Sequence, residues 1–204
     1  MPETNLATRI HERKYTPWYE KYKVDIPEGE SGPWRIERFE ASEGIGTLRA
    51  EWEGRPIDPG TYTRLMRGGT LVMSDTPAEI RDHRALFRNA TGRVLIHGLG
   101  LGVALRGVLL KDDVTHVDVV EIDEDLISLV APHLEDPRVH IHHGDALTFE
   151  FPKGITWNAA WHDIWDDICA DNLPAMKRLH RRYGSRCNWQ ASWCRHECEN
   201  GRWS

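Results

Sequence analysis

Hydrophobic and polar positions between residues 94 and 193 alternate in a way that predicts strands separated by helices. Short runs of β-forming residues are followed by longer stretches whose apolar residues recur at helical spacing. Such an order is typical of a parallel sheet with right-handed crossovers and helices on both faces. The expected strands are Val94–His97, Val117–Glu121, Arg138–His143, Trp157–His162 and Trp189–Trp193, and the expected helices are Leu101–Lys111, Glu124–Ala131 and Leu173–Tyr183.

The residues before this α/β pattern divide into two segments. Residues 1–33 are polar and aromatic with several prolines and glycines, so we expect an N-terminal arm. Residues 34–75 contain three short stretches of strand character and predict a small antiparallel β unit. A helix from Thr76 to Asn89 then opens the α/β domain of residues 76–204. The three stretches are Trp34–Phe39, Thr47–Trp52 and Thr70–Met73.

The fifth expected strand has only a few residues after it. We therefore expect a sheet truncated after strand five, with that strand at an exposed edge. An unpaired edge is usually covered or paired with another chain. The β unit of residues 34–75 covers it, or the protein forms a homodimer there.

Composition and charge exclude several classes of protein. The 204 residues carry a formal net charge of −6 from charges spread along the chain, so we expect no nucleic-acid partner. No apolar segment is long and unbroken enough for a signal peptide or a membrane span. All four cysteines lie after residue 168, which favours a reducing, cytoplasmic location.

The candidate chemistry begins at the turn Gly98-Leu99-Gly100-Leu101-Gly102, between the first expected strand and a helix. Glycines there let a ligand approach the backbone N–H groups at the start of the helix. Glu121 follows Gly100 by 21 positions at the end of the next strand, where a carboxylate accepts the two hydroxyls of an adenosine ribose. Asp145 follows the third strand at the same sheet edge, where it either accepts from an adenine amine or only forms a local Gly-Asp turn.

The kind of nucleotide can be narrowed from the same turn. A dinucleotide site needs Gly or Ala where this chain has Val103, and the Gly-Lys-Ser/Thr of a P-loop is absent. The pattern therefore favours S-adenosylmethionine. A nicotinamide-linked dehydrogenase, or a tight turn with a solvent-facing Glu121, stays open as an alternative.

From residue 65 to about 170 the chain resembles the spermidine-synthase-like branch of the class I S-adenosylmethionine-dependent transferases. Val94 to Leu109 resembles the strand-one motif of that family, and Glu121-Ile122-Asp123 resembles its Glu-Ile-Asp. Gly144-Asp145-Ala146 resembles its Asp-Gly turn. The segment from Trp157 to Asp166 aligns without a gap to Tyr-Asp-x-Ile-x-x-Asp-Ser-Ser-Asp.

This resemblance implies a Rossmann-like fold, an enzyme and a set of site residues. Asp163 becomes the general base that frees the lone pair of an amine, and Asp166 becomes a substrate anchor. A sulfonium donor is already activated, so aligning an unprotonated nucleophile is the main task of the enzyme. The implied donor-binding residues are Gly98, Gly100, Gly102, Glu121, Ile122, Asp145 and Ala146.

The chain also departs from the family motif. Leu101 stands where the family has Asp, and that loss removes an expected partner for an aminopropyl amine. We therefore expect methyl transfer from S-adenosylmethionine to a small amine, with aminopropyl transfer from its decarboxylated form as the alternative. A ligand-binding or interaction protein that has lost catalysis is a further alternative.

No metal site is expected. The late residues Cys187, Cys194, His196 and Cys198 lack a Cys-x-x-Cys half-site. The expected partners are a small-molecule substrate and, through the edge of strand five, a second copy of the chain.

Overall fold

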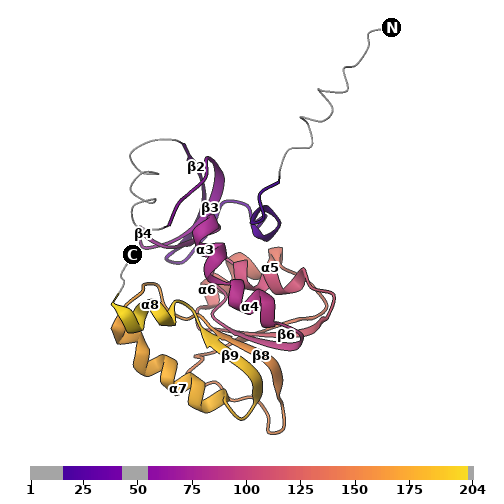
Figure 1. Ribbon diagram of the computed structural model, residues 1–204. Coiled ribbons are helices and arrows are strands. Elements are labelled where there is room, and N and C mark those ends of the chain that lie inside the picture. The colour runs from indigo at the N-terminus through magenta and orange to yellow at the C-terminus, as the bar shows by residue number, and fades with distance from the viewer. Residues whose placement is uncertain (1–15, 43–54, 202–204) are drawn as a thin grey trace, which may run out of the picture.

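The computed structural model describes residues 16–42 and 55–201, which form two sheets (Figure 1). The first sheet is antiparallel, with strand order β1-β2-β3-β4, and the second is parallel, with order β7-β6-β5-β8-β9. The first sheet comprises β1 (Gly29–Ser31), β2 (Trp34–Ala41), β3 (Gly60–Arg67) and β4 (Thr70–Ser74). The second comprises β5 (Gly92–His97), β6 (Val114–Glu121), β7 (Val139–His143), β8 (Trp157–His162) and β9 (Cys187–Ser192).

Helices connect and cover the parallel sheet. The α-helices are α3 (Pro77–Asp82), α4 (Arg84–Asn89), α5 (Val103–Leu109), α6 (Glu124–Val130), α7 (Leu173–Tyr183) and α8 (Arg195–Asn200). Three short 3₁₀ helices are η1 (Glu20–Tyr22), η2 (Ala131–His133) and η3 (Ala170–Asn172). The longest described helix, α7, has 11 residues, and none of the described helices has the length and apolar character of a membrane span.

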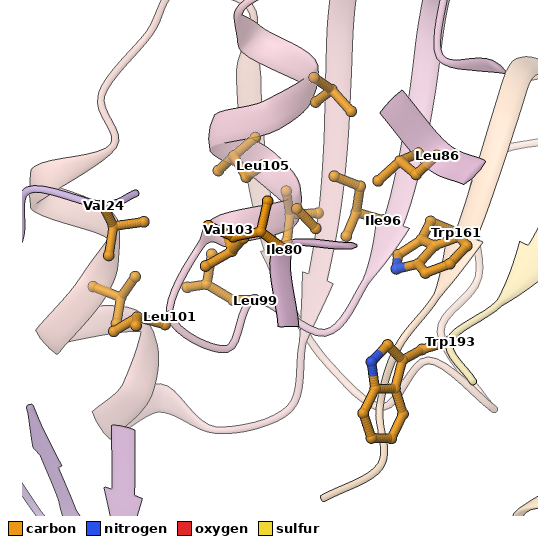
Figure 2. Packing of buried hydrophobic residues seen from close by; sticks show 14 of the residues in the cluster. Val24, Ile80, Leu86, Ile96, Leu99, Leu101, Val103, Leu105, Trp161 and Trp193 are labelled. Atoms are coloured by element: carbon orange, nitrogen blue, oxygen red, sulfur yellow. The ribbon is translucent and has the colours of Figure 1, made fainter. Parts of the chain in front are cut away.

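Two hydrophobic clusters lie on opposite faces of the parallel sheet, because successive strand residues point to opposite sides. Leu95 of β5 belongs to the cluster that includes Leu179 and Tyr183 of α7. Its neighbour Ile96 belongs to the larger cluster, together with Leu86 of α4 (Figure 2). The prediction of a parallel sheet with helices on both faces is confirmed.

Asp118 ties four strands of the parallel sheet together. Its carboxylate is only 2% exposed and accepts hydrogen bonds from Arg93 Nη2 of β5 at 2.8 Å, His142 Nε2 of β7 at 2.9 Å and Trp157 Nε1 of β8 at 2.8 Å. These bonds satisfy a carboxylate that would be costly to bury alone. Burial raises the pKa of Asp118, but the hydrogen bonds outweigh it and hold the pKa at about 2.

The N-terminal part differs from the expectation in two places. Strand β1 and helix η1 lie within the segment expected as an arm, and Tyr19, Val24 and Ile26 of that segment are buried in the larger cluster. The expected strand Thr47–Trp52 lies outside the described residues, whereas β3 was not expected. The segment boundaries at 33/34 and 75/76 stay a prediction.

Strand β3 was missed because its pattern is more polar than that of a typical strand. Arg64 stands directly opposite Glu37 of β2, and Arg64 Nη2 lies 2.6 Å from Glu37 Oε2. Such a cross-strand ion pair stabilises the pairing of two half-exposed strands. Arg64 made the strand hard to predict from the sequence, because its partner Glu37 is brought opposite it only when the sheet forms.

The expected helix Thr76–Asn89 is two helices, α3 and α4, that break at His83. His83 has φ −84° and ψ 0°, and its side chain is buried. At the other end of the chain, β9 pairs only with β8 among the described residues, and it is followed by α8, which was not expected.

Candidate active site

The turn Gly98–Gly102 joins the end of β5 to the start of α5 and is packed tightly against its own chain. Gly98, Gly100 and Gly102 have φ values of +90°, +50° and +81°, which favour glycine. A Cβ on Gly98 would overlap the backbone oxygen of Asp163, and one on Gly100 would overlap Met73 Sδ. The amide of Leu101 donates to Met73 Sδ at 3.0 Å. The glycines therefore bring the turn close to the loop after β8 and to β4.

Glu121 ends β6 and faces the glycine turn, as expected. Its Oε2 accepts from Leu99 N at 2.8 Å and its Oε1 accepts from Asp123 N at 2.9 Å. Each carboxylate oxygen has a second lone pair for a further donor. Beside it, Ile122 is 63% exposed, which is unusual for a large apolar side chain.

Asp145 forms a turn after β7 and also lines the site. Its Oδ1 accepts from Leu147 N at 2.8 Å, so the side chain does stabilise the local turn. Its Oδ2 is 3.4 Å from Thr148 Oγ1, which leaves this oxygen weakly engaged. Both the local and the ligand-binding interpretation of Asp145 are therefore compatible with its position.

A single cavity of about 210 Å³ brings most of the expected site residues together. The expected residues that line it are Gly98, Gly100, Glu121, Ile122, Asp145, Ala146, Asp163 and Asp166. Gly102 is not among the lining residues; a Cβ there would overlap Leu134, and Gly102 precedes the first residue of α5. Its role is therefore in packing and in starting the helix.

The antiparallel sheet contributes one wall of the cavity. Trp34 stands opposite Arg67, and Leu65 stands opposite Met73, so these four side chains share one face of the sheet. All four line the cavity. The guanidinium of Arg67 lies 5.2 Å from the Trp34 ring centroid and pairs with Asp166 from the loop after β8. This ion pair links the two sheets at the cavity.

The end of the cavity near Asp163 is acidic and shielded from water. The Asp163 side chain is 18% exposed, and burial together with the carboxyl of Glu79 raises the pKa of Asp163 to about 8. Burial likewise raises the pKa of Glu79 to about 7, although Arg55 opposes this effect. A base whose pKa lies near neutrality is suited to proton transfer.

His83 lies beside this acidic group because of the break between α3 and α4. Its Nδ1 is 3.8 Å from Asp163 Oδ2, and burial lowers the pKa of His83 to about 4. Neither ring nitrogen makes a hydrogen bond to another described residue. A neutral imidazole therefore faces Asp163.

The sequence predictions missed several residues of this cavity, namely Arg67, Met73, Glu79, His83 and Trp193. They come from elements that precede the glycine turn or follow β9. Glu79 stands between the apolar Ala78 and Ile80, but neighbouring helical residues point in different directions, so this spacing did not predict a buried carboxylate. The remaining residues carry no local signal.

The fold and the cavity define a Rossmann-like α/β protein whose candidate ligand site lies at the carboxyl ends of parallel strands. No family model matches the chain. The curated relatives include a polyamine aminopropyltransferase of a Synechococcus strain, 36% identical over 99 residues, which are 45% of this chain and 31% of that protein. Polyamine aminopropyltransferase 2 of Hyperthermus butylicus is 28% identical over 165 residues, 71% of this chain and 53% of that protein.

Among solved structures, the spermidine synthase from Thermotoga maritima is 21% identical, with a TM-score of 0.47, covering 79% of this chain and 52% of that one. The matches span about one third to one half of the length of these relatives. The sequence similarity to curated polyamine aminopropyltransferases agrees with the resemblance found in the sequence motifs.

Proposed function

We propose that this chain is a transferase that moves an alkyl group from an S-adenosyl sulfonium donor to an amine. The observation that carries this proposal is the single cavity in which the glycine turn, Glu121 and Asp145 share walls with Asp163. Such a transfer needs residues that bind an adenosyl donor next to a buried base. In this chain these residues come from the ends of four different strands.

The donor-side residues fit an adenosyl group. Glu121 is held by two backbone amides, so its carboxylate is oriented before any ribose hydroxyl approaches it. Ile122 offers an exposed apolar surface to an adenine ring, and Asp145 Oδ2 is available to an exocyclic amine. When bound, the sulfonium supplies an electrophilic carbon with a neutral thioether as leaving group.

The acceptor-side residues fit an amine. Asp163 and Glu79 form a pair of carboxyls whose pKa values are raised by burial, so at neutral pH at least one of them holds a proton. A cationic amine that enters would favour the ionised form of Asp163 and could pass its proton to that carboxylate. The Trp165 and Trp193 side chains line the same cavity and give it aromatic walls.

Two candidates exist for the group transferred. Most of the curated relatives are polyamine aminopropyltransferases, with a ribosomal RNA methyltransferase among them, and they therefore support aminopropyl transfer better than methyl transfer. One observation favours methyl transfer: Leu101, which replaces the family Asp in the turn, is fully buried in the hydrophobic cluster (Figure 2). A buried leucine offers no carboxylate to the amine of an aminopropyl group.

Calorimetric titration with S-adenosylhomocysteine, 5′-methylthioadenosine and NAD tests the donor. We expect binding of at least one of the first two and none of NAD. The Glu121→Gln variant replaces an acceptor oxygen with a donor and should weaken that binding at least tenfold, while Glu124→Gln, three residues on at the start of α6, should not. Binding of NAD alone would favour a dehydrogenase.

Turnover then separates an enzyme from a binding protein. Product analysis after incubation with S-adenosylmethionine or its decarboxylated form and a set of diamines identifies the group transferred. Asp163→Asn should abolish product and retain donor affinity. Donor binding without product for any amine would leave the non-catalytic alternative. The cytoplasmic location and the homodimer through β9 stay predictions.

A further inference from the structure

Two histidines lie beneath the proposed site, at the ends of the strands that carry it. His97 ends β5 and His162 ends β8, and the two residues stand opposite each other in the parallel ladder. Both side chains are 0% exposed. Their Nδ1 atoms are 2.7 Å apart, and the rings are stacked at 4.9 Å with 17° between their planes.

The hydrogen bonds around this pair determine which nitrogen carries each proton. Gln190 Nε2 donates to the backbone oxygen of His180 at 2.9 Å, so Gln190 Oε1 is turned toward His162 Nε2, 3.1 Å away. His162 Nε2 must therefore donate, and in a neutral ring its Nδ1 then accepts. It follows that His97 donates through Nδ1, and that His97 Nε2 is an acceptor.

The groups packed around the pair hold both rings neutral. Tyr183 and Arg182 face it from α7, and His180 of the same helix packs on His162 with ring centroids 5.3 Å apart. His180 Nε2 bonds Ser192 Oγ of β9, and Arg195 of α8 approaches His180 Nδ1. Burial, with His162 and Arg182, holds the pKa of His97 well below its usual range. The positive charges of Arg182 and Arg195 in this group disfavour a further positive charge on the rings.

The residues that follow the two histidines are Gly98 and Asp163, one from the donor side and one from the acceptor side of the proposed site. Asp163 N donates to the backbone oxygen of His97 at 2.9 Å, and the backbone of Asp163 lies against the Cα of Gly98. No other side-chain bond between β5 and β8 lies as close to these two residues among those the structure describes. The histidine pair is the last side-chain link before the two segments separate.

We infer that the neutral His97–His162 pair is a positioning device that sets the distance between the glycine turn and Asp163. The pair acts through the backbone and touches neither donor nor acceptor. Its effect on donor affinity rests on the proposed function, whereas its protonation pattern and its effect on the backbone do not.

Nuclear magnetic resonance tests the pair without any ligand. Long-range ¹H–¹⁵N spectra of the full chain at pH 7 should show His162 as the Nε2–H tautomer and His97 as the Nδ1–H tautomer. The reverse assignment, or a charged ring, would overturn the inference.

Three variants then separate positioning from packing. His97→Asn keeps a donor near the Nδ1 position and should bind S-adenosylhomocysteine within about threefold of the wild type. His97→Ile leaves His162 Nδ1 buried without a partner and should lose both stability and at least tenfold in affinity. His97→Ile with His162→Val removes both Nδ1 atoms but also the donor to Gln190 Oε1, so it should regain part of the stability lost in His97→Ile and keep the weakened affinity.

A double variant that binds as tightly as the wild type would mean that the pair only fills space, and the inference would be wrong. If the wild type binds neither S-adenosylhomocysteine nor 5′-methylthioadenosine, the proposed function fails separately. In that case the chemical shifts of the Gly98 and Asp163 amides test the positioning role without a ligand. Shifts in the double variant that match those of the wild type would overturn this role.

Discussion

Replacing Asp163 with asparagine should stabilise the protein, and the gain should grow as the pH rises. In the folded protein the pKa of Asp163 is raised to about 8, chiefly by burial, whereas in the unfolded chain it takes its ordinary value of 3.8. The folded state therefore binds the proton more tightly. The stability of the wild type is greatest below the unfolded pKa and is lost as the pH rises toward about 8.

The size of this effect follows from the proton linkage. Each pH unit between the two pKa values costs about 1.4 kcal/mol, so the interval from pH 5 to pH 8 has a ceiling of about 4 kcal/mol. The Asp163 side chain is 18% exposed and shares its surroundings with Glu79, which reduces this ceiling. We expect the Asp163→Asn variant to gain about 2 kcal/mol relative to the wild type over that interval.

Urea unfolding followed by tryptophan fluorescence at pH 5, 6, 7, 8 and 9 measures the gain. Asp167→Asn, at an exposed carboxylate four positions further on, is the matched control and should run parallel to the wild type. If the Asp163→Asn and wild-type curves also run parallel, then Asp163 ionises in the folded protein as it does in water, and the argument for a buried base is refuted.

Three further outcomes follow from the structure. Gly98→Ala should abolish S-adenosylhomocysteine binding, because the φ of Gly98 is +90° and the added Cβ overlaps the Asp163 backbone. Gly154 has a similar φ of +88° but nothing within 4 Å of an added Cβ, so Gly154→Ala should cost only about 1–2 kcal/mol of strain in urea unfolding. Asp118→Asn should lower the free energy of unfolding at pH 7 by about 2 kcal/mol. Unfolding measured at successively lower pH should show this difference shrinking between pH 3.8 and about 2, where Asp118 of the wild type becomes protonated. Arg67→Gln should change stability by less than about 1 kcal/mol, because Arg67 and Asp166 are 48% and 42% exposed; a larger loss in urea unfolding would show that this pair holds the two sheets together.

Local sequence patterns were sufficient for the parallel sheet and for half of the site. Each of its five strands was expected within a few residues. The three central strands β5, β6 and β8 are mostly buried, and strands buried on both faces are largely apolar. The glycine turn and Glu121 were predicted from their spacing along the chain. A ligand site at strand ends depends on residues at set distances along the chain, so spacing alone was enough to predict these candidates.

The sequence could not predict features that depend on contacts between distant segments. The polar residues of β3 find a partner only where Glu37 lies opposite Arg64 in the sheet. The pKa of Asp163 is raised by burial first and by Glu79 of α3 second, and both depend on how the chain folds. His97 and His162 are 65 positions apart and bond only because β5 and β8 are neighbours in the sheet. Sequence alone thus predicted the order of elements in the parallel sheet and the candidate residues Glu121 and Asp163. Only the tertiary structure decided the burial and charge around Asp163, since both are set by whatever packs against it.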